Sequence, residues 1–241
     1  ATDAEQLPSF LNSSPSNAGL VRIDYRNNQE PFSGRVQIYQ VKSEKKDKLD
    51  TLRLLLASLG NQSSIVFLNY REAVERVNEY LQENGFVTGA FHGGMEQKSR
   101  EVSLYKFANG STNILVSTNL ASRGLDISNI DNIIHYHLPE TEEDFVHRVG
   151  RTARWMNTGR SFFILGPEER IPDYVEEKVD DYLLDPESIP AKPDLPKMAT
   201  IYIGKGKKDK VSRGDIVGFL CKKGGLKGDD IGKIDVLDRY A

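Results

Sequence analysis

Three arginines at intervals of three residues, Arg148, Arg151 and Arg154, form the most chemically suggestive pattern in the sequence. They follow His147 in the string HRVGRTAR, where Gly150 permits a turn at the end of a short predicted helix. An arginine fork is planar, always charged and matched to phosphate oxygens, so two arginines at this spacing can hold one γ-phosphate. Such a pair stabilises the charge of a phosphoryl group in transfer. A salt-bridged helix face or a contact with an RNA backbone fits the same residues.

A pair of glycines, Gly93 and Gly94, separates a predicted strand from a predicted helix that carries Arg100. Glycines before a helix leave backbone N–H groups open to an anion such as phosphate. Ordinary turn chemistry uses the same residues, so this pair alone does not distinguish a ligand site from a turn.

The string STNLASRGLD follows the apolar residues 114–116 and starts at the carboxyl end of a predicted strand. Open parallel sheets bind their ligands at that edge. Gly124 lets the backbone approach a ligand, and the carboxylate of Asp126 can accept a hydrogen bond from a ribose hydroxyl. A plain strand-to-helix loop is the alternative.

The elements that must position these loops alternate along the chain from residue 34 to about residue 181. Strands are predicted at 36–41, 65–68, 86–91, 113–117, 132–137 and 161–165, and helices at 45–59, 71–84, 97–108, 142–149 and 168–183. This alternation implies βαβ units, and hence an α/β fold with a parallel sheet and helices on both faces.

A proline-rich stretch at 185–197 is typical of an extended linker. Beyond it, strands are predicted at 200–203 and 233–237 and a helix at 213–222, with the single cysteine, Cys221, as a core residue. About 45 residues give little room for an independent core. We therefore predict an incomplete second unit at 198–241.

The net charge of −3 conceals an uneven distribution. From Lys197 onward there are 11 basic and 6 acidic residues, which gives +5, so the remaining 21 basic and 29 acidic residues give −8. A basic tail on an acidic body favours a polyanionic partner, although solvated basic faces are also common. One cysteine, no signal-peptide pattern and no apolar run near the roughly 18 residues of a membrane span favour a cytoplasmic protein without a membrane partner. Four histidines and one cysteine do not favour a metal site.

Taken together in this order, the strings FHGGMEQKSRE, STNLASRGLD and HRVGRTAR resemble motifs IVa, V and VI of the DEAD-box ATP-dependent RNA helicases. IVFLN at 65–69 resembles their motif IV. The resemblance covers residues 34 to 170 and implies a RecA-like C-terminal helicase domain at 34–184, with 1–33 as the end of the first helicase domain and the linker.

The resemblance implies nucleotide-binding roles for four residues. Arg151 and Arg154 match the arginine fingers that reach the γ-phosphate of ATP, which with Mg²⁺ is held mainly by the first RecA-like domain. Gly124 and Asp126 match ribose and nucleotide contacts of motif V.

It also implies residues for RNA and for coupling. Thr118, Gly93 and Arg100 match positions that hold the RNA sugar-phosphate backbone. His147 and Arg148 match the pair that links nucleotide and RNA contacts across the cleft between the two domains.

The chain departs from the family pattern at several positions. Asn119 and Leu120 stand where Asp and Val are usual, Gly94 replaces a frequent Asp, and Tyr70 stands where Thr is frequent. These departures leave the arginine fingers in place but put the Asn119 contact and an RNA role for Tyr70 in doubt.

The ATP-gripping Gly-x-x-x-x-Gly-Lys-Ser/Thr loop and the Asp-Glu-Ala-Asp motif are missing from the sequence. The opening Ala1-Thr2 resembles the end of motif III. We therefore expect a fragment of a longer enzyme that does not hydrolyse ATP alone.

The tail at 198–241 resembles the start of the RRM-like RNA-binding domain of the DbpA subfamily, whose members recognise ribosomal RNA. This likeness makes Lys207, Lys208, Lys210 and Arg213 candidate RNA contacts, and solubilising surface charge is the alternative.

The sequence as a whole predicts the C-terminal half of an RNA-dependent ATPase that unwinds short duplexes on ribosomal RNA during ribosome assembly. A plain RNA-binding module without catalytic duty is the competing interpretation, and a relative that acts on DNA is a third.

Overall fold

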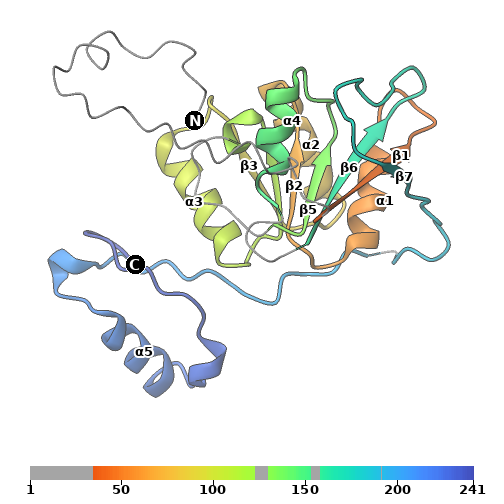
Figure 1. Ribbon diagram of the computed structural model, residues 1–241. Coiled ribbons are helices and arrows are strands. Elements are labelled where there is room, and N and C mark those ends of the chain that lie inside the picture. Colours follow the sequence, from red (N-terminus) through yellow and green to blue (C-terminus); the bar gives the residue numbers. More distant parts are fainter. Residues whose placement is uncertain (1–34, 123–129, 153–157, 191) are drawn as a thin grey trace, which may run out of the picture. The chain divides into compact units, whose positions relative to one another are not determined.

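The computed structural model of the 241-residue chain describes residues 35–122, 130–152, 158–190 and 192–241 (Figure 1). The predicted contacts Gly124, Asp126 and Arg154 lie outside these ranges, as does all of 1–33. No helix among the described residues is both long and apolar enough to cross a membrane.

The described residues form one parallel sheet of seven strands in the order β3-β4-β2-β5-β6-β1-β7 (Figure 1). The strands are β1 (Val36–Lys42), β2 (Ser64–Phe67), β3 (Thr88–Phe91), β4 (Ile114–Ser117), β5 (Asn132–His135), β6 (Gly159–Leu165) and β7 (Val179–Asp181). The neighbouring strands β3, β4, β2 and β5 all run in the same direction, so their carboxyl ends lie along one edge of the sheet. This topology confirms the predicted parallel α/β, RecA-like sheet.

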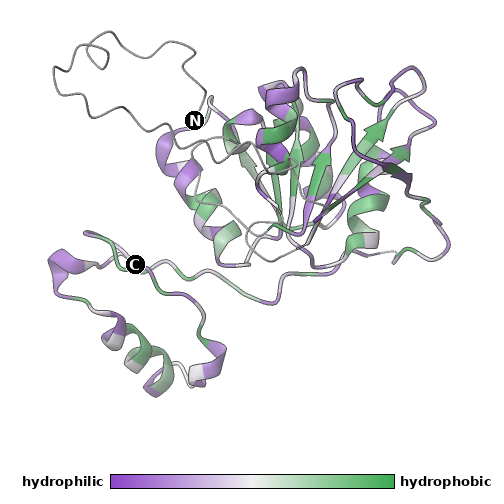
Figure 2. Cartoon of the chain, viewed as in Figure 1, coloured by the Kyte–Doolittle hydropathy of each residue, from purple (hydrophilic) through white to green (hydrophobic). Residues whose placement is uncertain are grey.

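Four helices of this body follow the predicted pattern. They are α1 (Leu49–Leu59), α2 (Arg71–Glu83), α3 (Gln97–Ala108) and α4 (Glu142–Val149). In α2 the buried residues Val74, Val77 and Leu81 repeat at intervals of three and four, which places them on one face of a helix. α4 begins where the Thr141 hydroxyl accepts a hydrogen bond from the backbone N–H of Asp144. Figure 2 shows largely apolar strands in the interior and helices that mix hydrophobic and hydrophilic residues around them.

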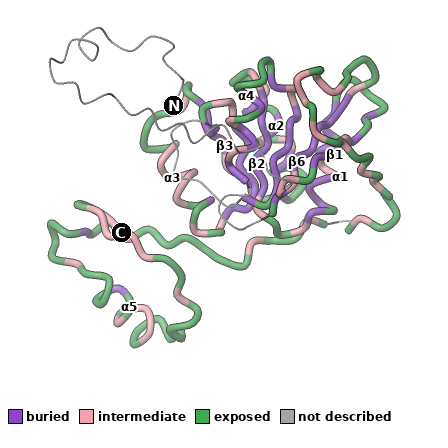
Figure 3. Tube along the Cα trace, viewed as in Figure 1, coloured by how far each residue is buried: buried purple, intermediate pink, exposed green. Residues whose placement is uncertain are grey.

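Alternate residues of the central strands pack into two separate hydrophobic cores. Val66 of β2 belongs to a cluster that also contains the buried leucines of α1 and Val74 of α2. Ile65 and Phe67 belong to the other cluster, together with Phe107 of α3. Successive side chains of a strand point to opposite faces, so helices cover both faces of the sheet as predicted. Figure 3 shows the resulting burial along the strands.

The predicted helix at 168–183 is wrong. Residues 166–178 contain turns and bends, and β7 follows as an edge strand that pairs with β1. Pro172 explains the error, because proline lacks a backbone N–H and disfavours helical geometry at the residue before it. Tyr182 and Leu184 then pack against the core, so apolar residues that suggested a helix face serve an extended segment.

The tail has one predicted helix and lacks both predicted strands. α5 (Arg213–Lys222) has the predicted bounds, and Ser212 and Asp215 form a capping box at its start. Residues 200–203 and 233–237 are not strands, although Ile203 and Ala241 exchange two backbone hydrogen bonds of 2.8 and 2.9 Å. Cys221 is only half-buried, so its predicted core position is also wrong.

Gly159 at the start of β6 allows Thr152 to approach the sheet. A Cβ added at Gly159 would lie 1.8 Å from Thr152 Oγ1, a distance that side chains cannot accept. Thr152 is paired with Ile130 in an isolated parallel bridge, and its hydroxyl donates to the carbonyl of Ile130. The close contact therefore sets the position of the segment that carries the arginines.

Replacing Gly159 with alanine should lower the free energy of unfolding by roughly 1–3 kcal/mol, because a methyl group at this position forces Thr152 and its backbone to move. Gly89→Ala in β3 is the matched control, since its added Cβ would meet Leu115 Cδ1 at an ordinary 3.6 Å. Urea unfolding measures both variants. Equal losses in the two would contradict the close-contact explanation.

Candidate functional site

Loops from four neighbouring strands meet at the carboxyl edge of the sheet, where parallel sheets bind ligands. The Gly93 loop follows β3, Thr118 follows β4, Asn69 follows β2 and His137 follows β5. Helix α4, which leads into the arginine segment, contacts the 3-10 turn Asn119–Ser122 after β4. The strand order thus brings together three of the motifs that the sequence separates by dozens of residues.

Arg148 is the centre of this edge and is fully buried. Its Nε donates to Asn119 Oδ1 at 2.7 Å, and its Nη2 donates to Asn69 Oδ1 at 2.8 Å. Its Nη1 donates to the carbonyl of His137 at 2.8 Å. The guanidinium also lies over the ring of Phe67, 5.2 Å from its centroid. One side chain of α4 therefore ties together the ends of β2, β4 and β5.

The hydrogen-bond acceptors of Arg148 at the three strand ends are all neutral. Burial lowers the pKa of Arg148 to about 10, and electrostatic interactions with Asp144, Tyr174 and Glu140 oppose this shift. The guanidinium therefore remains charged at neutral pH. A buried charge of this kind is tolerated only when its donors are satisfied, so the amides of Asn69 and Asn119 are required partners rather than optional ones.

Two histidines complete the network as neutral hydrogen-bond acceptors. Burial and the nearby Arg148 charge hold the pKa of His135 well below its usual value of 6.5. His135 Nδ1 lies 3.5 Å from Arg148 Nη1, and its Nε2 lies 3.0 Å from Ser161 Oγ. Burial also lowers the pKa of His137, whose Nδ1 accepts from the backbone N–H of Asn69 at 3.1 Å. Both rings are therefore uncharged at neutral pH.

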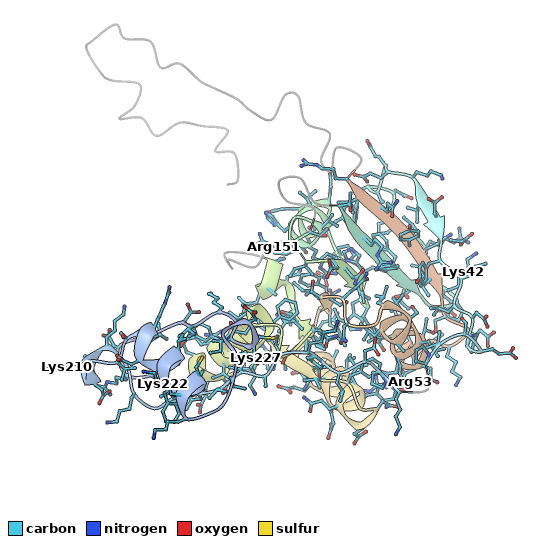
Figure 4. All side chains as sticks on the ribbon, turned by 90° about the horizontal axis from the view of Figure 1, so that it is seen from below. Lys42, Arg53, Arg151, Lys210, Lys222 and Lys227 are labelled. Carbon is cyan, nitrogen blue, oxygen red and sulfur yellow. The ribbon has the colours of Figure 1, made fainter. Side chains whose placement is uncertain are left out.

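Arg151, one of the two predicted fingers, lies one turn beyond Arg148 and is labelled in Figure 4. The residue is only 9% exposed. Its backbone N–H donates to the carbonyl of Arg148 at 3.2 Å, and its own carbonyl accepts from Ile130 at 3.3 Å. The main chain of Arg151 is thus fixed on both sides. His147 is half-buried, with Nδ1 3.7 Å from Glu143 Oε1.

The glycine loop after β3 is held by His92, a buried residue whose contribution the sequence did not reveal. His92 Nδ1 accepts from the backbone N–H of Gly94 at 3.2 Å, so Nε2 carries the proton that it shares with Glu75 at 2.5 Å. A Cβ at Gly93 would meet nothing within 4 Å, so this backbone faces open space. A Cβ at Gly94 would instead crowd His92 and Arg71 at 3.1 to 3.3 Å.

Thr118 lies beside this loop. Its backbone N–H donates to the carbonyl of Phe91 at 3.3 Å, and Ser117 Oγ donates to the same carbonyl at 2.7 Å. Arg100 is half-buried on α3, where its Nη2 donates to Gln97 Oε1 at 2.6 Å. The structure thus links Thr118 directly to the last residue of β3 and leaves the Arg100 charge without an ion pair among the described residues.

The tail carries its own basic candidates. Lys207, Lys208, Lys210 and Arg213 are exposed and form no salt bridge with the described residues. Lys205, in contrast, is held by Asp209 at 2.9 Å. In Figure 4, Lys210 lies near the start of α5, whereas Lys222 belongs to its last turn. Four cations close together in sequence are thus available to a polyanion.

The network around Arg148 was missed from the sequence, although one signal for it was present. Asn69 and Asn119 each stand just beyond an apolar strand, at two corresponding strand ends. Nothing in their spacing reveals that a single guanidinium joins them. No group of three acidic, histidine or cysteine side chains that could hold a metal occurs in the described part of the chain.

Comparisons with known proteins agree with this geometry. A family model described as "Helicase conserved C-terminal domain" matches residues 45–156, and one described as "DbpA RNA binding domain" matches residues 200–241. The chain is 37% identical over 204 residues to the ATP-dependent RNA helicase DbpA of Escherichia coli, covering 83% of this chain and 44% of the relative. It is 31% identical over 227 residues to DbpA of Bacillus subtilis, covering 83% and 47%.

A solved structure supports the same fold. The chain resembles the E. coli DEAD-box protein SrmB, solved with the regulator of ribonuclease activity A, with a TM-score of 0.58 and 25% identity. The match covers 69% of this chain and 97% of that chain. The chain spans less than half the length of the two DbpA relatives.

The two lowered histidine pKa values predict acid sensitivity. Below about pH 6.5 these two imidazole rings become protonated in the unfolded chain but stay neutral in the folded chain. The free energy of unfolding therefore falls as pH decreases toward the folded-state pKa values. Above that pH their contribution is fully present. Urea unfolding between about pH 7.5 and pH 5.5 should show the decline, and His135→Asn, which keeps an acceptor toward Arg148, should make it shallower. An identical slope in the variant would contradict this origin.

Proposed function

Because the chain belongs to the DEAD-box RNA helicases of the DbpA subfamily, we propose that it forms the C-terminal half of an RNA-dependent ATPase. In the whole protein, ATP and RNA draw the first RecA-like domain onto the carboxyl edge of this sheet. The observation that carries the proposal is the buried Arg148, which precedes Arg151 by one turn and binds the ends of β2, β4 and β5. The end of β4 carries Thr118, and the Gly93 loop follows the neighbouring strand β3.

The proposed catalytic duty of this half is electrostatic. Arg151 and Arg154 reach the γ-phosphate of ATP in the neighbouring domain and stabilise the charge that builds during its transfer. Gly124 and Asp126 hold the nucleotide. In this proposal Mg²⁺ is held mainly by the neighbouring domain. The described residues contain no group of three acidic, histidine or cysteine side chains that could hold it. His147 and Arg148 couple the nucleotide contacts to the RNA contacts, and Arg148 does so from the interior of the domain.

The proposed RNA duty falls on backbone contacts at the edge and on the tail. Gly93, Arg100 and Thr118 hold the sugar-phosphate chain without reading its sequence, which suits local unwinding of any short duplex. Lys207, Lys208, Lys210 and Arg213 add the attachment to a structured RNA, for which we propose ribosomal RNA in the cytoplasm, as in ribosome assembly. The matched DbpA RNA-binding region supports an RNA partner for this tail.

Arg151→Ala, made in a protein that also carries the first helicase domain, tests the finger. RNA-stimulated ATP turnover should fall roughly a thousand-fold or more, while RNA affinity stays within about two-fold. Arg53→Ala is the matched control, because Arg53 belongs to α1 and lies well apart from Arg151 in Figure 4. Turnover close to wild type, with weaker and less salt-dependent RNA binding, would instead support the binding-module alternative.

Replacing Lys207, Lys208 and Lys210 with alanine tests the tail. RNA affinity of the 241-residue chain should fall, and the dependence of log affinity on log salt should become shallower by roughly 2, because each lost phosphate contact removes about 0.7 to 0.9. The control changes Lys222, Lys223 and Lys227, which removes the same charge from the same region. Equal losses would show a general charge effect rather than a binding surface.

A further inference from the structure

Tyr70 presents an exposed aromatic ring at the functional edge of the sheet. It follows Asn69 directly and stands as the first flanking residue of α2, with an extended backbone and no capping bond from its side chain. The residue is 62% exposed, whereas the apolar residues before it in β2 are completely buried. The ring serves neither the core nor the helix start, so its exposure calls for another explanation.

The surroundings hold Tyr70 in place without covering it. Its ring meets the His137 ring edge to face, at 5.8 Å between centroids and 67° between planes. His137 is fixed in turn, because its Nδ1 accepts from the backbone N–H of Asn69 and its carbonyl accepts from Arg148. The residue before Tyr70 and the ring beside it are therefore both anchored to the buried guanidinium. A ring that is oriented before a ligand arrives loses little conformational entropy on binding.

Tyr70 also neighbours the surface proposed for the RNA backbone. Arg71 lies against the glycine loop, since its Cδ is 3.3 Å from the position of a Cβ at Gly94. β4, which is followed by Thr118, lies between β3 and β2, so Tyr70 follows Gly93 and Thr118 along one edge. A strand of RNA that follows these backbone contacts passes the Tyr70 ring.

The charges near Tyr70 favour a base rather than another phosphate. Glu140 Oε1 accepts from Asn69 Nδ2 at 3.2 Å, and Glu75 carries the hydrogen bond to His92. These carboxylates disfavour a second phosphate at this point, whereas a nucleobase brings no charge. Aromatic side chains next to cationic ones are the usual means by which proteins stack unpaired bases.

We propose that Tyr70 stacks on an unpaired base of RNA that lies along this edge, so that the chain binds a base as well as the sugar-phosphate backbone. The inference rests on the proposed function, since it assumes that RNA follows Gly93 and Thr118. It adds a base contact that a threonine, frequent at this position in the family, cannot make. A stacked base is held out of a duplex, which favours the separated strand.

The test compares two RNA decamers with the same number of phosphates, one of adenosine and one with abasic riboses. Fluorescence anisotropy measures the affinity of the full chain, with Lys207, Lys208 and Lys210 replaced by alanine throughout to silence the tail. Tyr70→Ala and Tyr70→Leu should weaken binding of the adenosine decamer about five- to a hundred-fold and leave the abasic decamer unchanged. Tyr70→Phe, which keeps the aromatic face, should bind both as the parent does.

The outcomes separate this proposal from the proposed function. Arg100→Ala should weaken both decamers alike, because it removes a backbone contact. If it does so while Tyr70→Ala changes neither, the stacking proposal is overturned and RNA binding at the edge stands. Equal weakening of both decamers by Tyr70→Ala also overturns stacking, since the ring then supports the backbone site alone. If the parent chain binds neither decamer, RNA binding at this edge fails and stacking fails with it.

Discussion

The buried charge of Arg148 is the constraint on which the rest of the site depends. Removing a guanidinium from water is costly, and this one is compensated by three hydrogen bonds to neutral acceptors and by an aromatic face, while Asp144 and Glu140 add electrostatic stabilisation. Its partners stand at the ends of β2, β4 and β5, so these loops have one arrangement that satisfies the charge. Any other arrangement leaves a buried donor unpaired. The fixed geometry of the edge is therefore a consequence of electrostatics as well as of sheet packing.

Asn119 illustrates how the family pattern can change without losing this constraint. An aspartate, which is usual at this position, would give Arg148 a counter-ion, whereas the amide gives it only a dipole. Burial lowers the pKa of Arg148 to about 10, although Asp144, Tyr174 and Glu140 oppose the shift. In this chain the Asn119 amide oxygen accepts the hydrogen bond from Arg148 Nε at 2.7 Å, so an uncharged side chain serves as the partner of the guanidinium.

The fold was largely predictable because its helices and strands have different periodicities. The bounds of α3, α4 and α5 agree with the sequence, and the β-branched runs mark the central strands. The error at 168–183 arose because Pro172 outweighed an apolar pattern. The site was predictable only as a set of motifs. That Arg148 lies inside the domain, and that His92 holds the glycine loop, depends on contacts between residues distant in sequence, which periodicity does not encode.

The same network connects the proposed nucleotide contacts to the proposed RNA contacts. The backbone of Arg151 bonds to the Arg148 carbonyl, and the Arg148 side chain holds the loops that lead to Tyr70 and Thr118. The proposed γ-phosphate contact is therefore connected to the proposed RNA contacts through a short chain of hydrogen bonds. Correct placement of ATP therefore favours correct placement of RNA, and the reverse, because both sites are connected through the buried, hydrogen-bonded guanidinium of Arg148. In the proposed mechanism, this coupling requires no conformational change within the domain itself, only its approach to the first helicase domain as one body.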